Sequence, residues 1–291
     1  MSEVEESEAE DTCSRCASCG IADIDNVVPC DDCDLVNKQR AAVLRDELLF
    51  KQPESTHMGD CPICSLPMPL DVSKTATMGC CSKLICKGCA LANASREIEL
   101  RLDQKCPFCR EPTCITNKEY GKLLMKRVEM NDPVAIFQQG SNQYDKGYYS
   151  RAFKYWSKAA ELGSTEAHYE LAGLYHSGEG VKKEWEKGIH LLEKAAIGGH
   201  PEARYSLGCY EWNIGQEWNN VGNFKRAVKH WIIAAKQGDD DAIKKVLNAF
   251  RSGRISKEEL TTTLRAHKAA VDATKSPQRE EAQASECFLY M

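Results

Sequence analysis

The chain has 291 residues, enough for two or three compact units, because one hydrophobic core usually serves about 100 to 200 residues. Its formal net charge of −5 disfavours a nucleic-acid partner, since the summed field repels a phosphate backbone. No stretch approaches the ~20 apolar residues that span a bilayer, and the acidic first residues do not resemble a signal peptide. We therefore expect an intracellular protein, cytoplasmic or nuclear, without a membrane anchor.

The sixteen cysteines are distributed unevenly, with fourteen of them before residue 115. Without a secretory signal we expect them to stay reduced, and clustered thiols in a reducing compartment are usually metal ligands. Spacings of the form Cys-x-x-Cys strengthen this interpretation, because two thiolates on one turn can bind the same zinc ion. In chain order the sequence predicts an acidic disordered tail over residues 1–12, a zinc finger over 13–36 and a helical linker over 37–54.

The first two cysteine pairs are Cys16 with Cys19 and Cys30 with Cys33. Their surroundings resemble the first half of a MYND zinc finger, a peptide-binding module whose remaining ligands are absent here. In that family the two pairs bind different metal ions, so a truncated copy cannot bind metal as the family does. Either the four cysteines regroup around one zinc ion or the site is vestigial, and both interpretations stay open.

Residues 55–115 contain three Cys-x-x-Cys pairs and one adjacent pair, which are Cys61, Cys64, Cys80, Cys81, Cys86, Cys89, Cys106 and Cys109. Eight thiolates satisfy two tetrahedral zinc ions, and a segment with so few apolar residues needs metal to fold. The pattern resembles a RING finger. This resemblance implies a cross-brace, in which one zinc ion is held by Cys61, Cys64, Cys86 and Cys89 and the other is completed by Cys106 and Cys109.

The second pair departs from the RING pattern, because Lys83 stands where a histidine ligand is usual. A lysine ammonium group does not bind zinc, so we infer that Cys80 and Cys81 both serve as ligands. The alternative is that Cys81 acts with a remote ligand such as Cys114 or His57.

The RING resemblance also implies a function. RING ubiquitin ligases bind a ubiquitin-loaded conjugating enzyme and hold its thioester ready for attack, which is catalysis by positioning. Ile63 and Pro107 match their apolar contacts with the conjugating enzyme, and Arg110 matches a position that bridges the enzyme and ubiquitin. No catalytic nucleophile is expected, because zinc-bound thiolates cannot act as one. The helix expected over 90–104 offers no bulky aromatic residue to the conjugating enzyme.

After a helical linker expected over residues 116–131, the chain repeats itself with a period of 36 and then 39 residues. Blocks that begin at Tyr155, Leu191 and His230 each contain an Ala-Ala pair followed by a glycine. Apolar residues at helical spacing predict two antiparallel helices in each unit, and the glycine can form a left-handed cap. Stacked units can bury faces that a single unit cannot.

Residues 171–199 contain Leu-Ala-x-Leu-Tyr and Lys-Ala-Ala-x-x-Gly motifs and resemble a Sel1-type repeat, a relative of the tetratricopeptide repeat. The fold implied is mainly α, with a small zinc-stabilised RING module followed by a helical solenoid of Sel1-like repeats over 132–272. The third copy lacks the Ser-Gly-Glu-Gly-Val motif of the second, so we expect a longer, altered loop over 213–219. Residues 273–291 lack the period and are expected to be a tail.

Together these patterns favour a RING-type ubiquitin ligase, which recruits a conjugating enzyme and ubiquitin through its RING and a protein substrate through its repeats. The alternative is a zinc-binding adaptor for protein–protein interaction without enzymatic activity. We expect two zinc ions in the RING, and a third if the N-terminal cysteines regroup.

Overall fold

A computed structural model describes residues 31–113, 116–218 and 220–285. The chain divides into two compact units, residues 1–49 and 50–291. Of the first unit the structure describes the helix α1 (Asp31–Phe50), which continues into the first residue of the second. Three cysteines of the expected N-terminal finger, Cys16, Cys19 and Cys30, lie outside the described residues, and Cys33 lies in the first turn of α1.

The cysteine-rich segment of the second unit contains little regular structure. It consists of a short 3-10 helix η2 (Val72–Lys74), two strands β1 (Thr75–Thr77) and β2 (Leu84–Cys86), and the helix α2 (Lys87–Glu99). The strands pair antiparallel, so residues 78–83 form a hairpin loop. The buried cluster of this segment is Cys61, Met68, Ile85, Cys86, Cys89 and Ala90. Half of it is cysteine, so its apolar core is too small to stabilise the segment alone.

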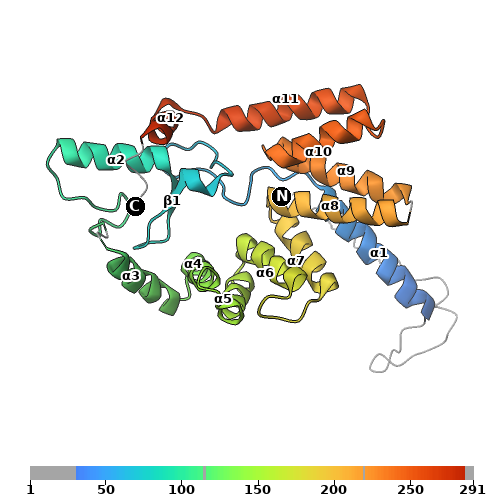
Figure 1. The fold of residues 1–291 in the computed structure, drawn as a ribbon, viewed down its shortest axis with the longest axis horizontal. Coiled ribbons are helices and arrows are strands. Elements are labelled where there is room, and N and C mark those ends of the chain that lie inside the picture. The colour runs from blue at the N-terminus through green and yellow to red at the C-terminus, as the bar shows by residue number, and fades with distance from the viewer. Residues whose placement is uncertain (1–30, 114–115, 219, 286–291) are drawn as a thin grey trace, which may run out of the picture. The chain divides into compact units, whose positions relative to one another are not determined.

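After this segment, the regular structure of the described residues is entirely helical (Figure 1). A first helix α3 (Asn117–Glu129) leads into three helix pairs, which are α4 (Pro133–Tyr144) with α5 (Tyr149–Glu161), α6 (Thr165–Ser177) with α7 (Trp185–Ile197), and α8 (Pro201–Glu217) with α9 (Val221–Lys236). They are followed by α10 (Asp240–Arg251), α11 (Lys257–Ala273) and α12 (Pro277–Ala284). The mainly α-helical solenoid expected from the repeats is confirmed. None of the helices in the described ranges combines the length and apolar character that crossing a membrane requires.

Local sequence explains where the repeat helices begin and end. The first helix of each pair, and α10, begins after a residue whose side chain accepts a hydrogen bond from a backbone N–H of the following turn, namely Asp132, Ser164, His200 and Asp239. The second helix of each pair is followed by a glycine with positive φ, namely Gly163 at 89°, Gly199 at 86° and Gly238 at 97°. Residues with a Cβ rarely adopt this conformation, so the glycines predicted as left-handed caps are required there.

Two tryptophans anchor the core of the repeats. Trp156 and Trp231 are almost fully buried, and their indole N–H groups donate to backbone oxygens of the preceding helix at 3.2 and 3.3 Å. Each indole lies against a helical glycine, Gly140 or Gly208, where an added Cβ would stand 2.4 Å from the ring. The same tryptophan-on-glycine contact therefore recurs in the first and third helix pairs.

The substitution Gly208→Ala tests this contact. The added methyl group would overlap the indole of Trp231, so either the ring or the helix must shift. We expect the free energy of unfolding to fall by about 1–3 kcal/mol, the usual cost of overpacking, in urea denaturation. The matched control is Gly173→Ala in α6, where nothing lies within 4 Å of the new Cβ. Its stability should stay the same or rise by up to about 1 kcal/mol, and equal losses in both variants would contradict the packing argument.

The prediction of a longer loop in the third repeat is wrong. Helix α8 continues to Glu217, and α9 begins at Val221, so the extra residues lengthen the helix. The C-terminal part of α8 is held by a tertiary contact, because Trp212 packs edge-on against Phe224 of α9 with ring centroids 4.8 Å apart. Gly215 leaves room for the same phenyl ring, since a Cβ there would approach it to 2.9 Å.

Residues 273–291, expected as a tail, contain the helix α12. Its start is marked by local signals, since the side chain of Ser276 accepts from the N–H of Arg279 and Pro277 occupies the first turn. Helix α12 packs against α2 of the cysteine-rich segment (Figure 1). The approach is close at Gly88, where an added Cβ would stand 2.8 Å from the backbone nitrogen of Arg279. The C-terminal part of the chain therefore returns to the cysteine-rich segment.

Candidate metal centre

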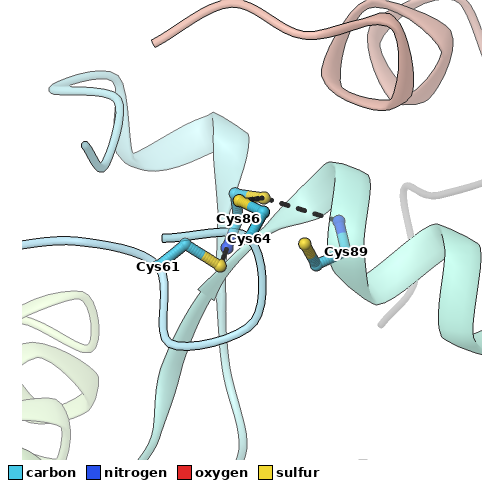
Figure 2. A group of neighbouring side chains, drawn as sticks. All are labelled: Cys61, Cys64, Cys86 and Cys89. Atoms are coloured by element: carbon cyan, nitrogen blue, oxygen red, sulfur yellow. Dashed lines mark hydrogen bonds between the residues drawn. The ribbon is translucent and has the colours of Figure 1, made fainter. Parts of the chain in front are cut away.

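Four cysteine sulfurs meet at the start of α2, as Figure 2 shows. Cys61 and Cys64 come from one turn, Cys86 ends β2, and Cys89 lies in the first turn of α2. All four sulfurs lie within 4.8 Å of one another, and those of Cys64 and Cys86 are 3.9 Å apart. Zinc–sulfur bonds of about 2.3 Å in a tetrahedron separate the sulfurs by about 3.8 Å, so this group fits a zinc ion.

A second group joins the hairpin loop to a later turn. Cys80 and Cys81 lie in the loop between β1 and β2, and their partners are Cys106 and Cys109. The sulfur of Cys80 lies 3.3 Å from that of Cys109, and the sulfur of Cys81 lies 3.7 Å from that of Cys106. A tight turn at Ser82, with φ 57°, follows the adjacent pair. The two neighbouring cysteines thus reach one group, as the sequence argument required in place of a histidine.

The turns that carry Cys61 and Cys106 have the same backbone geometry. In each turn the N–H of the first cysteine donates to the carbonyl oxygen five residues later, at 2.9 and 2.8 Å. The residue after the second cysteine has positive φ in both, 54° at Ser65 and 63° at Arg110. Left-handed backbone costs a residue with a Cβ about 1–2 kcal/mol. Its recurrence at equivalent positions is explained if both turns are shaped to present two sulfurs to one ion.

The two groups alternate along the chain. The first takes the first and third cysteine pairs, and the second takes the second and fourth pairs. This alternation is what a cross-brace, as implied by the RING resemblance, requires. Each ion held in it would tie together segments about 20 residues apart, which is how a segment with a very small apolar core can keep a defined fold.

One thiol in each group has a pKa below its usual value. Burial opposes ionisation of Cys61, but backbone N–H groups of its own turn and of Cys86 lower its pKa to about 7. Burial likewise opposes ionisation of Cys106, whose pKa is nevertheless lowered by backbone N–H groups of its own turn. Burial and then neighbouring thiols raise the pKa of Cys80 and Cys89. Four thiolates at this spacing therefore need a bound cation, which zinc would supply.

An arginine of α12 completes the surroundings of the first group. Arg279 is 6% exposed. Its Nη2 donates to the sulfur of Cys64 at 3.4 Å and to the oxygen of Leu66 at 3.2 Å, and its Nη1 donates to the oxygens of Pro67 and Thr274, both at 2.7 Å. A fixed guanidinium offsets part of the negative charge of the thiolates. Sequence reasoning missed this residue, because a single arginine 215 positions after Cys64 gives no signal.

The segment before Cys61 is attached to the repeats through His57. Its backbone N–H donates to the carbonyl oxygen of Gly199 at 3.1 Å, and its imidazole stacks on that of His200 with ring centroids 4.1 Å apart. Burial lowers the pKa of His57, against the opposing effect of the Glu166 carboxylate. His57 is thus a packing residue outside both groups. Cys114, the other remote ligand considered, lies outside the described residues.

The three residues expected to contact a conjugating enzyme lie on the surface of the two turns. Ile63 is 44% exposed, Pro107 is half-buried and Arg110 is exposed. Pro107 and the small residues Ala90 and Ala94 of α2 line a shallow hollow. Helix α12 contacts a different face of α2 and does not cover this hollow.

Comparison with known proteins supports the repeats. Residues 137–164, 165–200 and 201–239 match the model of the Sel1 repeat. Protein SHC1 of Saccharomyces cerevisiae is 32% identical over 106 residues, which are 33% of this chain and 20% of that protein, in strain ATCC 204508 / S288c and in strain YJM789. The chain thus spans about a fifth of the length of the curated relatives it matches.

Two solved structures are similar to the chain. A Sel1 repeat protein from Oxalobacter formigenes has 22% sequence identity and a TM-score of 0.44, over 68% of this chain and 71% of that one. The protein c5321, a protective antigen of uropathogenic Escherichia coli strains with an SLR fold, has 16% identity and a TM-score of 0.39, over 60% and 37%. The Sel1 matches do not include residues 61–109, so the RING resemblance depends on cysteine spacing and geometry.

Proposed function

We propose that the chain is a zinc-binding RING-type ubiquitin ligase. In this proposal the turns of the cysteine-rich segment recruit a ubiquitin-loaded conjugating enzyme, and the Sel1 repeats hold a protein substrate. The observation that carries the proposal is the pair of alternating four-cysteine groups, which present Ile63, Pro107 and Arg110 on their turns. The Sel1 repeats point to protein partners, which agrees with a substrate arm.

The chemistry of such a ligase lies in positioning. Zinc would supply only structure, because its four thiolate ligands leave no open position for a reactant. The exposed side chain of Ile63 offers apolar area, and the guanidinium of Arg110 offers five donors on a backbone held rigidly by the turn. Held at fixed distance from the ions, these groups could orient a thioester for attack by a substrate amine.

Ubiquitin transfer tests the proposal directly. The purified protein, mixed with ubiquitin, activating enzyme and a panel of conjugating enzymes, should form ubiquitin chains. Gel electrophoresis measures their formation. Ile63→Ala and Arg110→Ala should each slow chain formation about tenfold or more, as loss of a central contact worth at least 1.4 kcal/mol would. The control is Val72→Ala on η2, which removes an apolar side chain that is 73% exposed on the same segment.

The wild-type chain must first be shown to hold its zinc ions, so that inactivity cannot be traced to a missing metal. A zinc-loaded chain that forms no ubiquitin chains with any conjugating enzyme would overturn the ligase proposal. Val72→Ala should retain full activity. If it lost as much activity as Ile63→Ala, the turn that carries Ile63 would have no specific role in binding the conjugating enzyme.

One observation favours the alternative, a zinc-binding adaptor without ligase activity. Helix α2 contains no aromatic residue, and it lines the hollow beside Pro107 with Ala90, Asn93 and Ala94. Many active RING fingers place a bulky aromatic side chain against the conjugating enzyme at this helix. Titration calorimetry with conjugating enzymes separates the two functions, because an adaptor would show no binding to them while its repeats still capture a partner.

A further inference from the structure

A groove of about 440 Å³ lies along the repeats between α6, α7 and α8. Its walls are rich in aromatic side chains, which include Tyr169, Tyr205 and Trp185. Unlike the two buried tryptophans of the core, Trp185 is 47% exposed. Its ring stands edge-on to that of His176, with the ring centroids 4.1 Å apart. Large rigid side chains at a surface supply contact area to a partner at small entropic cost. Tyr169 and Tyr205, which stand at repeat positions, thus both face the groove, and Tyr205 also packs against the core.

Glu170 is the only carboxylate among the residues that line the groove. It is half-buried, and within the described parts of the chain no lysine, arginine or other donor contacts it. Burial, and then the charges of Glu202 and Asp145, raise the pKa of Glu170. The local field is therefore negative, and an added cation beside Glu170 would relieve it.

Gly173 lies one helical turn after Glu170 on α6, on the same face of the helix. It is exposed in the groove, its φ is not positive, and an added Cβ would meet nothing within 4 Å. Neither backbone conformation nor internal packing requires a glycine here, although glycine in a helix is less stable than alanine. What the glycine does provide is bare backbone, which lets another chain approach the floor of the groove.

We propose that this groove binds a segment of a protein partner that inserts a lysine or arginine side chain toward Glu170. The aliphatic stem of such a side chain can lie along the aromatic walls, its cationic end can pair with the carboxylate, and the partner backbone can pass over Gly173. The proposal deepens the proposed function, because it names the chemistry of the partner that the repeats hold.

Peptide binding to the full chain tests it without any component of the ubiquitin reaction. The probes are fluorescent 12-residue peptide libraries with random flanks and one central residue, which is lysine, arginine or their uncharged analogues norleucine and citrulline. By fluorescence polarisation the lysine and arginine libraries should bind at least tenfold more tightly than the uncharged ones. Glu170→Gln should remove this preference, and Gly173→Leu should fill the groove and abolish binding of all four libraries.

Matched controls separate the groove from general effects. Glu161→Gln removes an exposed carboxylate of α5 outside the groove, and Gly121→Leu adds a side chain at a helical glycine of α3 with nothing within 4 Å of its Cβ. Both should bind the peptides like the unaltered chain. Gly173→Leu should also keep an unchanged or higher melting temperature, since leucine favours a helix, so its loss of binding would not reflect unfolding.

Two results would overturn the proposal. One is binding without preference for a basic residue, or a preference that survives Glu170→Gln. The other is binding of a blocked single arginine, N-acetylarginine amide, as tightly as the peptides, which would make the groove a small-molecule site. Failure of ubiquitin transfer affects neither readout, so a chain that is inactive as a ligase can still confirm the groove.

Discussion

Replacing Cys80 with serine should lower the zinc content of the chain by one ion. Cys80 is the residue that decides between the two ligand sets considered for the irregular second site, because the alternative uses Cys81 with a remote ligand and leaves Cys80 free. In the structure its sulfur lies 3.3 Å from that of Cys109 and belongs to the second four-cysteine group. A structural zinc site is closed by four protein ligands that share about 10–16 kcal/mol of binding free energy near neutral pH, so a site left with three thiolates should bind zinc much more weakly and lose its ion during purification.

Native mass spectrometry of the full chain measures this content directly. Cys209→Ser is the matched control, because Cys209 is a half-buried cysteine of α8 that belongs to neither group. It should leave the zinc content unchanged. Retention of every zinc ion by Cys80→Ser, together with loss of one in Cys114→Ser, would show that a remote ligand completes the site and would contradict the adjacent pair.

Replacing Arg279 with alanine should weaken zinc binding at the first group by about 10–100-fold, the usual cost of losing a donor that orients a metal ligand. The variant loses the positive charge beside Cys64 and leaves the backbone oxygens of Leu66 and Pro67 without the guanidinium. Helix α12 should then loosen from the cysteine-rich segment, because this arginine supplies hydrogen bonds to Cys64, Leu66 and Pro67 of that segment. Two independent measurements are available, competition with a chromophoric chelator and hydrogen exchange of residues 277–284.

Two further variants separate the loss of zinc affinity from general destabilisation of the protein. Arg279→Lys keeps the charge but cannot donate to several oxygens at once, so zinc affinity should recover in part while exchange in α12 stays fast. Arg265→Ala removes an exposed arginine of α11 and should change neither quantity. Unchanged zinc affinity in Arg279→Ala would show that the arginine only packs and has no influence on the metal group.

The features predicted correctly from the sequence are those with local signals. The helix pairs follow from apolar spacing, from caps such as Asp132 and Ser164, and from the glycines that close each pair. The cysteines have a local signal in their spacing as well, and the structure gathers the eight of residues 61–109 into two groups of four. The assignment of zinc and of ligase activity stays a prediction.

The features missed depend on contacts between distant residues. Helix α12 is only eight residues long and too short to show a period, and what fixes it is Arg279 on backbone oxygens more than 200 positions away. The extra turn of α8 depends on Phe224, which packs against Trp212 and leaves room only for a glycine at position 215. Glu170 and Gly173 gave no individual signal, because a glutamate and a glycine become informative only when the fold places them in one aromatic groove.

The contacts of His57 and Arg279 also bear on how the repeats respond to force. Solenoids are elastic, since each repeat contacts only its neighbours and small rotations add up along the stack. Here the stretch from Gly199 to Arg279 is fastened at both ends to the same cysteine-rich segment, by the His57 backbone bond and by the guanidinium bonds. Extending helices α8 to α11 therefore requires one of these attachments to break, and we expect release of Arg279 to lower the force that this part of the repeats withstands.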